Sequence, residues 1–413
     1  MDDVYDVAVI GGGVVGCSVL FELTNHGYKC VLLEKSPHLL TGASCGNSGM
    51  LHTGFDAEPD SLELRCIQLC QRRIADVFQK LGLPYNRLGA RMVAWDEKQK
   101  ALLPRVVERS LHAGISDIEE ISISRLYQEE PYLNSGACAA LWIPGETILD
   151  PWMTPIAFAH HSKLKGAKIL TDCRVRGLER SYTNQWEILT DKQTVISGAV
   201  INCAGLYGDI VDRLVNQQSF SIQPRKGQYL VYNRNTQHLL TSSILPVPTE
   251  RTKGVIVFKT VYGNVVVGPT AEDVDQRDGM RTIIDPAVTR RLISHAHSTI
   301  PLLKTHSVVH MYSGIRPATR QKDYQIKAYP ERNWITVGGI RSTGVSACLG
   351  IAEITRKHLL EGLKQEPSGT PVSELEQLQF EYSSPGLMKV FDTEYTITHP
   401  ITLCGLSRPP ASL

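Results

Sequence analysis

Asp6-Val-Ala-Val-Ile10, Gly11-Gly-Gly-Val-Val-Gly16 and Cys30-Val-Leu-Leu-Glu34 are the stretches that decide the fold. The first is an apolar run rich in β-branched residues, which predicts a buried strand. A helical pattern follows from Val14 to Asn25, and Gly27 closes it. The last stretch predicts a second strand that ends in an acid. Strand, glycine turn, helix, strand and terminal acid together are typical of dinucleotide binding.

Each residue of this motif has a physical task. Gly11 permits the tight turn, Gly13 lets the backbone approach a pyrophosphate, and Gly16 lets the helix pack closely on the strand. The helix N-terminus offers N–H groups and a positive dipole end to phosphates. Glu34 is placed to accept hydrogen bonds from a ribose hydroxyl. The motif alone does not separate NAD from FAD, but its position near the N-terminus favours FAD.

The segment Lys35 to Phe55 is rich in glycine and small polar residues, with neither helix nor strand periodicity. Small residues let a backbone lie against a flat ligand. Ser44, Asn47 and Ser48 are therefore predicted to bind a cofactor phosphate or ring edge. The alternative is an ordinary loop. We favour cofactor binding because the segment directly follows the ribose-binding acid.

Two later segments repeat the pattern of a strand followed by a glycine turn. In Gly198–Asp209 the turn follows a buried strand ending at Asn202, and Trp334–Gly344 opens a long helix. Such returns are needed when an extended ligand such as FAD crosses the sheet, whereas the alternative is one more strand-to-helix turn. These segments and one preceding strand add the cofactor-binding candidates Val175, Ala204, Gly205, Gly339, Thr343 and Gly344.

The predicted fold class is α/β, with a Rossmann-type FAD-binding domain interleaved with a substrate domain on a mostly antiparallel sheet. The FAD-binding domain is assigned residues 1–84, 145–215 and 331–366, and the substrate domain residues 85–144 and 216–330. Residues 367–413 form a C-terminal extension to which the sequence gives no role. Asp60 and Glu63 are predicted to cap the helix that follows them.

Composition narrows the function classes. The 413 residues contain 43 lysines and arginines against 42 acids, a net charge of +1, so no basic field indicates a nucleic-acid partner. No apolar run approaches the roughly 20 residues of a transmembrane helix, although peripheral membrane contact stays open. A strand that begins by Val4 leaves no room for a signal or transit peptide. Ten scattered cysteines without a recurring C-x-x-C pair predict reduced thiols, no metal site and a cytoplasmic location.

Four segments, 11–34, 42–54, 200–209 and 337–352, resemble the FAD-dependent D-amino-acid oxidase superfamily. Asn47-Ser-Gly-Met-Leu-His-Thr-Gly54 is similar to the flavin loop of L-2-hydroxyglutarate dehydrogenases and anaerobic-type FAD-dependent glycerol-3-phosphate dehydrogenases. Three further stretches are more similar to the glycerol-phosphate branch: Pro224–Tyr229, Ser313–Pro317 and Gly339–Gly344. Relatives in that branch often carry a C-terminal iron–sulfur module with closely spaced cysteines, whereas Cys404 stands alone here.

The resemblance implies FAD as cofactor and hydride transfer from a C–H bond to flavin N5, with loss of an alcohol or amine proton. An alcohol needs a base, and histidine suits this task near neutral pH. His52 is the candidate, with a purely structural histidine as the alternative. Arg316 and Arg341 fall where the family places the substrate face, and guanidinium groups bind carboxylate or phosphate. Arg225 and Lys226 are weaker candidates.

The helix that begins near Thr343 is expected to direct its N-terminus to the flavin, where its dipole would stabilise the reduced ring.

The sequence therefore predicts an FAD-dependent dehydrogenase of a small anionic 2-hydroxy compound, either glycerol 3-phosphate or a 2-hydroxy acid such as L-2-hydroxyglutarate. Quinone, oxygen and a carrier protein remain open as electron acceptor. One alternative is an amine or amino-acid oxidase of the sarcosine or glycine oxidase type, which can act without a strong base. Another is a non-catalytic flavin-binding subunit whose C-terminal extension contacts a partner.

Overall fold

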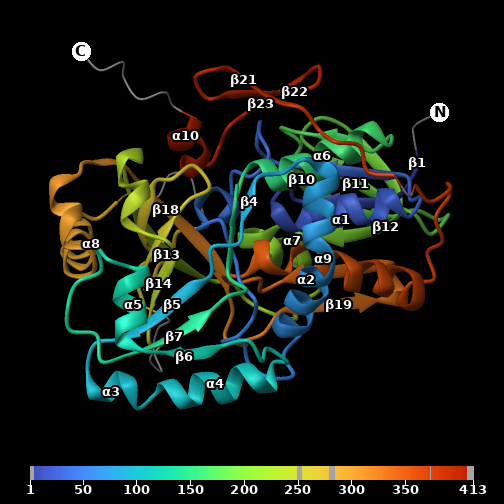
Figure 1. Cartoon of the computed structure of the whole chain (residues 1–413). Helices are drawn as coiled ribbons and strands as arrows, with labels where there is room; N and C mark the ends of the chain where they lie inside the picture. Colours follow the sequence, from blue (N-terminus) through green and yellow to red (C-terminus); the bar gives the residue numbers. More distant parts are fainter. Residues whose placement is uncertain (1–3, 249–253, 279–283, 373, 407–413) are drawn as a thin grey trace.

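Two large β-sheets, of eight and nine strands, are built from interleaved segments of the chain (Figure 1). The computed structural model describes residues 4–248, 254–278, 284–372 and 374–406. Within these ranges, no helix combines the length and the apolar character that crossing a bilayer requires. The predicted fold class, a Rossmann-type sheet with a second, mostly antiparallel sheet, is confirmed.

The eight-stranded sheet has a parallel centre. Its parallel strands are β1 (Val4–Ile10), β2 (Cys30–Leu33), β9 (Lys168–Leu170), β12 (Thr194–Asn202) and β20 (Trp334–Gly338). Antiparallel strands β10 (Val175–Arg180), β11 (Trp186–Thr190) and β19 (Gln325–Tyr329) complete it. The central strands are buried, as the continuous apolar runs predict. The domain boundaries stay a prediction, and β19, which precedes residue 331, pairs with β20.

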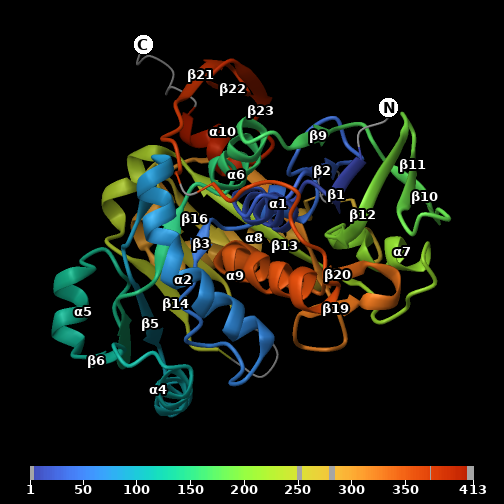
Figure 2. The same ribbon diagram turned by 90° about the vertical axis from the view of Figure 1, so that its right-hand side faces the viewer.

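Helices α1 (Val14–Asn25), α2 (Leu62–Leu81) and α9 (Gly344–Lys357) pack together beside this sheet (Figure 2). The predicted cap of α2 is wrong. Ser61, not Asp60, is the N-cap, and the Asp323 carboxylate accepts from the N–H groups of Leu62 and Glu63. An acid 260 positions away in sequence therefore caps the helix, which local spacing could not reveal.

The nine-stranded sheet is mostly antiparallel. Its strands are β5 (Ala90–Ala94), β6 (Glu119–Ile121), β7 (Ala139–Ile143), β13 (Gln223–Tyr232), β14 (Ser243–Pro246), β15 (Ile256–Lys259), β16 (Val265–Gly268), β17 (Glu272–Asp273) and β18 (Val308–Ala318). Helices α3 (Glu97–Lys100), α4 (Leu103–His112), α5 (Ile123–Glu129) and α8 (Pro286–Thr299) belong to this half. The long antiparallel pair β13–β18 carries the residues discussed below.

A small third sheet joins segments from both halves. It consists of β3 (Met50–Leu51), β8 (Thr147–Leu149) and β4 (Tyr85–Asn86). Helix α6 (Met153–Leu164) follows β8 and packs on α1. The third sheet therefore ties the loop after β2 to the middle of the chain.

The C-terminal extension is folded, although its sequence shows little periodicity. It forms the antiparallel sheet β21 (Phe380–Ser384), β22 (Leu387–Val390) and β23 (Thr393–Thr396), and then α10 (Pro400–Leu406) (Figure 1). His399, between β23 and α10, is fully buried, and this burial lowers its pKa to about 3. The segment from Ile397 to Thr402 is thus buried in the protein, whereas most of β21 is exposed; residues 407–413 lie outside the described residues.

Asp150 joins the extension to both halves of the protein. Its buried carboxylate accepts from the backbone N–H of Trp152 at the start of α6, from Tyr262 Oη at 2.6 Å and from Thr402 Oγ1 at 2.9 Å. A buried carboxylate is tolerated only when such donors replace its lost hydration. The carboxylate therefore holds α6, the β15–β16 turn and α10 together.

We expect Tyr262→Phe to lower the free energy of unfolding by about 1.5–3 kcal/mol, because hydrogen bonds to charged groups have this magnitude. Urea unfolding followed by circular dichroism measures it. Tyr182→Phe is the matched control, since Tyr182 is fully exposed. Equal stability of the two variants would show that the Tyr262 hydroxyl does not support Asp150.

Candidate active site

The turn between β1 and α1 is a backbone cradle that excludes side chains. Gly11 has φ +108°, and a Cβ there would lie 2.5 Å from the Cys203 carbonyl oxygen. A Cβ on Gly16 would lie 1.9 Å from the Gly11 carbonyl oxygen. The turn and α1 can pack this closely only with glycine at these positions, which agrees with the predicted tasks of Gly11 and Gly16. Gly13 precedes the first residue of α1 and lines a large cavity.

Glu34 follows β2 and closes the same cradle. Its Oε2 accepts from Gly12 N at 2.7 Å, and its Oε1 accepts from Ser36 N at 2.8 Å. The carboxylate is buried and lines the cavity. Glu34 therefore fixes the glycine turn to the second strand, and ribose binding by it stays a prediction.

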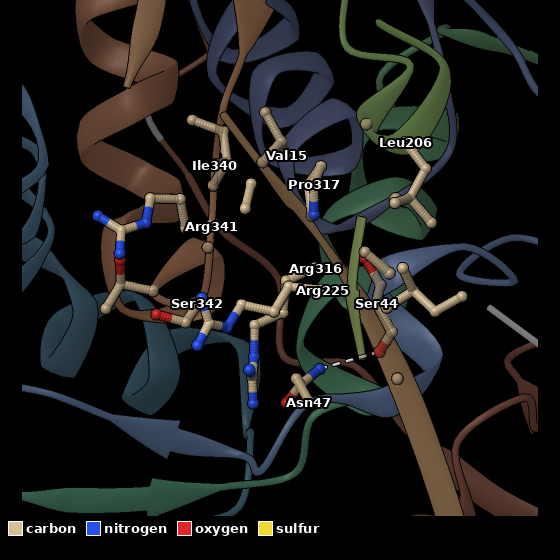
Figure 3. Close-up of a pocket in the computed structure, with 18 of the residues that line it drawn as sticks. Val15, Ser44, Asn47, Leu206, Arg225, Arg316, Pro317, Ile340, Arg341 and Ser342 are labelled. Atoms are coloured by element: carbon tan, nitrogen blue, oxygen red, sulfur yellow. Dashed lines mark hydrogen bonds between the residues drawn. The ribbon is translucent and has the colours of Figure 1, made fainter. Parts of the chain in front are cut away.

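The small polar residues of the following loop also line the cavity, and their side chains are engaged within the protein. Ser44 Oγ accepts from Val14 N at 2.9 Å, at the first turn of α1. Asn47 Nδ2 donates to Ser44 O at 2.9 Å, while Asn47 Oδ1 accepts from Gly49 N at 2.7 Å (Figure 3). Ser48 Oγ accepts from Met50 N. These bonds shape the loop, and direct contact of the side chains with a cofactor stays a prediction.

The remaining predicted cofactor residues approach the cavity from three other segments. Val175 at the start of β10 lines it, as do Ala204 and Gly205 in the turn after β12. Thr343 and Gly344 line it at the N-terminus of α9, whereas Gly339 does not belong to the lining. Gly339 instead has φ +67° in the turn after β20. The cavity has a volume of about 2560 Å³.

His52 lines the cavity just after β3 and is tied to an acid that the sequence did not indicate. Its Nδ1 lies 2.7 Å from Glu146 Oε2. The side chain of His52 is 23% exposed, whereas that of Glu146 is 1% exposed. Of the two residues, only His52 lines the cavity. Glu146 lies in the turn between β7 and β8, and nothing in its local sequence distinguishes it.

Arg316 lies beside Arg225 rather than beside Arg341. Antiparallel pairing of β13 and β18 places Arg225 directly opposite Arg316, and both line the cavity (Figure 3). Arg225, the weaker candidate from the sequence, is therefore the neighbour of Arg316. Arg341 lines the cavity but points away from these two side chains, and its Nη1 donates to Lys322 O at 2.8 Å (Figure 3).

Each of the two guanidinium groups has a polar partner among the described residues. Arg225 is 3.6 Å from Asp273, whose side chain is 87% exposed and therefore screened by water. Arg316 Nη2 donates to Thr270 O at 3.2 Å and lies over Gly227. Burial raises the pKa of nearby Tyr229, and the charge of Arg316 partly offsets this effect. The pair is thus a concentrated positive region inside the cavity.

Thr343 shows why the start of α9 is rigid. Its Oγ1 bonds to Glu63 Oε1 at 2.5 Å and to Tyr324 Oη at 2.7 Å. Burial raises the pKa of the Tyr324 hydroxyl, which stays protonated. The α9 N-terminus is therefore held at the cavity by three side chains, and its predicted dipole effect on a reduced cofactor stays a prediction.

The comparison with known protein families gives a match over residues 6–357 to the DAO family, described as FAD dependent oxidoreductase. The chain belongs to this family. The cavity fits its cofactor, because the glycine turn at Gly11 and Gly13, the α1 N-terminus and Glu34 all line it. The protein is therefore an FAD-dependent oxidoreductase, as the sequence predicted.

Three relatives have a named activity. The chain is 29% identical to glycerol 3-phosphate oxidase of Mycoplasma pneumoniae, covering 88% of this chain and 96% of that protein. It is 28% identical to glycerol 3-phosphate dehydrogenase of Caloramator mitchellensis, covering 84% and 72%. It is also 28% identical to L-2-hydroxyglutarate dehydrogenase of Indibacter alkaliphilus, covering 67% and 70%.

Solved structures agree with this assignment. The reduced L-α-glycerophosphate oxidase of Mycoplasma pneumoniae with FAD bound superimposes with a TM-score of 0.80 at 28% identity, covering 86% of this chain and 95% of that one. Glycine oxidase of Geobacillus kaustophilus, at 21% identity and a TM-score of 0.75, shows the shared fold.

We expect Gly16→Ala to weaken FAD binding roughly tenfold or more, equivalent to about 1.4 kcal/mol. The added methyl group would force the first turn of α1 away from Gly11. An unchanged circular dichroism spectrum first shows that the variant is folded. Titration of its apoprotein with FAD, followed by flavin fluorescence, then measures the affinity.

Gly362→Ala is the control, since a Cβ there meets only Ala328 Cβ, at an ordinary contact distance of 3.4 Å, and Gly362 lies outside the cavity lining. If both variants bind FAD as tightly as the original protein, the glycine turn is not the cofactor cradle.

Proposed function

We propose that this protein oxidises the secondary hydroxyl of glycerol 3-phosphate to a ketone. The observation that carries the proposal is the Arg225–Arg316 pair in the same cavity as His52. Side chains directly opposite on antiparallel strands have Cβ atoms about 4.5–5.5 Å apart, and like charges at this separation repel. The repulsion becomes favourable binding energy when a compact anion lies between the two groups.

A phosphate suits this pair better than a carboxylate. Near neutral pH a phosphate monoester carries a charge of about −1.5 to −2 and three acceptor oxygens on one centre. Two adjacent guanidinium groups offer a matching charge and several donors in fixed directions. The two carboxylates of 2-hydroxyglutarate are spread along a chain and would place only one charge at the pair. The named functions of two relatives support the same substrate.

His52 is proposed to take the hydroxyl proton. Its imidazole is held by Glu146 and faces the cavity, as a general base must. When bound, FAD supplies the acceptor for the hydride that leaves the carbinol carbon. Gly11, Gly13, Gly16, Glu34 and the N-terminus of α1 would hold its dinucleotide part. The remaining predicted lining residues would surround the rest of it.

Other parts of the prediction keep the status of proposals. Oxygen, a quinone or a carrier protein would reoxidise the enzyme, and relatives named oxidase and dehydrogenase cover more than one acceptor. A cytoplasmic location is supported by ten unpaired thiols. Arg341 would act at the cavity wall rather than in the anion pair.

The amine-oxidase alternative receives less support from the site. Such a reaction can start from a neutral amine without a strong base, so it does not use a carboxylate-bound histidine. The non-catalytic alternative placed a partner contact in the C-terminal extension, and three of its residues, Thr398, His399 and Thr402, are buried within this chain.

Anaerobic mixing with a panel of substrates tests the proposal. We expect glycerol 3-phosphate to bleach the visible flavin absorbance faster than L-2-hydroxyglutarate, sarcosine or glycerol. Bleaching by L-2-hydroxyglutarate alone would reassign the substrate to a carboxylate. Bleaching by sarcosine alone would indicate the amine reaction, and no bleaching by any compound would refute catalysis of this class.

Arg316→Ala is expected to raise the KM for glycerol 3-phosphate about 10- to 150-fold, because a hydrogen bond to a charged group contributes about 1.5–3 kcal/mol. Initial rates over a range of substrate concentrations measure this effect. Arg316→Lys should recover part of the affinity, since it keeps the charge without the fork.

Arg290→Ala is the control for this series, because Arg290 is exposed on α8, outside the cavity. A KM of Arg316→Ala that matches this control would contradict phosphate binding by the pair.

A further inference from the structure

Glu146 stands opposite His52 because of the register of the third sheet. β3 and β8 pair antiparallel with Met50 opposite Ile148 and Leu51 opposite Thr147. The next pair along this ladder is His52 and Glu146. Backbone pairing therefore brings together two residues that are 94 positions apart in sequence. The backbone pairing, and not side-chain flexibility alone, therefore places His52 next to Glu146.

Both oxygens of the Glu146 carboxylate form hydrogen bonds with the adjacent residues His52 and Thr53. Oε2 bonds to His52 Nδ1 at 2.7 Å, while Oε1 accepts from Thr53 N at 2.8 Å and from Thr53 Oγ1 at 3.0 Å. A carboxylate whose second oxygen is held by two donors cannot rotate away from the histidine. With a side chain 1% exposed, it is also protected from competing water.

The neighbouring residues leave room for this arrangement. A Cβ on Gly145 would lie 2.4 Å from Thr53 Cγ2, so the turn before β8 must carry glycine for Thr53 to reach Glu146. Glu146 O accepts from Gly89 N at 2.9 Å, which anchors the turn on its other side.

The backbone of His52 is fixed as well. Its N–H donates to Ser346 Oγ at 2.8 Å in the first turn of α9, and its carbonyl accepts from Gln71 Nε2 at 2.9 Å on α2. With the backbone held on two sides, the main remaining freedom of His52 is rotation of its side chain. The bond to Glu146 removes that freedom.

We propose that Glu146 is a positioning residue that sets the tautomer and orientation of His52. A carboxylate accepts only, so it keeps a proton on Nδ1 and makes Nε2 the proton acceptor. The substrate O–H bond would then break, an N–H bond would form at Nε2, and the electron pair would stay on the substrate oxygen. The adjacent carboxylate would stabilise the resulting imidazolium. This inference rests on the proposed role of His52 as base.

Glu146→Gln tests the role, because the amide can donate to Nδ1 and favour the wrong tautomer while keeping nearly the same volume. We expect kcat for glycerol 3-phosphate to fall about 100-fold or more, with KM changed less than about threefold. Glu146→Asp keeps a carboxylate and should recover part of kcat. Thr53→Val removes only one bond to Oε1 and should cost a few-fold at most.

A double-mutant cycle separates positioning from general support of the fold. In a His52→Gln background, Glu146→Gln should cause little further loss, because the two residues act as one unit. Equal multiplicative losses in both backgrounds would overturn the proposal.

The tautomer can be observed without turnover. In protein with nitrogen-labelled histidine, His52→Gln identifies the ring signals of His52 among the 13 histidines. We expect an Nδ1–H form in the original protein and in Glu146→Asp, and loss of that form in Glu146→Gln. An unchanged tautomer in Glu146→Gln would refute the inference whatever the substrate.

The two proposals fail separately. If no alcohol bleaches the flavin while the tautomer changes as expected, the proposed substrate is wrong and the positioning role stands. If glycerol 3-phosphate is oxidised and Glu146→Gln keeps its kcat, the positioning role is wrong and the proposed function stands.

Discussion

The backbone contact between Gly46 and Gly314 sets the geometry of the whole site. A Cβ on Gly46 would lie 2.3 Å from Gly314 Cα, and a Cβ on Gly314 would lie 2.4 Å from Gly46 O. The cofactor loop and β18 can approach this closely only because both positions lack side chains. Two residues before Gly314, Tyr312 Oη donates to Asn47 O, and two residues after it stands Arg316. One contact therefore joins the loop that carries Ser44 and Asn47 to the strand that carries Arg316.

Charge compensation distinguishes the parts of the site that hold structure from those open to a substrate. Glu34, Glu146 and Asp150 are buried acids, and each accepts at least two hydrogen bonds from the protein. These donors satisfy the buried carboxyl oxygens whether or not a ligand is bound. Arg225 and Arg316 are different, because their positive charges oppose each other and meet mainly an exposed acid and a carbonyl. Ligand binding would relieve this repulsion.

The sequence predicted what depends on local order and missed what depends on pairing between distant strands. Helix α1 matches its predicted range, because strand, turn and helix are contiguous. The N-cap of α2 was assigned to Asp60, one residue before the actual N-cap Ser61, and the added contribution of Asp323 could not be read from local sequence. Local sequence also could not show that Arg225 stands opposite Arg316, since only the β13–β18 register shows this pairing. Glu146 could not be found, because no periodicity marks an acid in a turn.

The proposed proton acceptor and the proposed anion-binding pair belong to different sheets, and under this proposal their separation constrains the substrate. His52 is held by the β3–β8 ladder and α9, while Arg225 and Arg316 extend from β13 and β18. A substrate must therefore present its anionic group and its reacting hydroxyl at a fixed separation, which a rigid scaffold enforces more strictly than loops do. The identity of the anion can change through the two arginine positions without disturbing the histidine and its carboxylate. In the proposed mechanism, specificity for the charged group and removal of the proton therefore depend on separate parts of the fold.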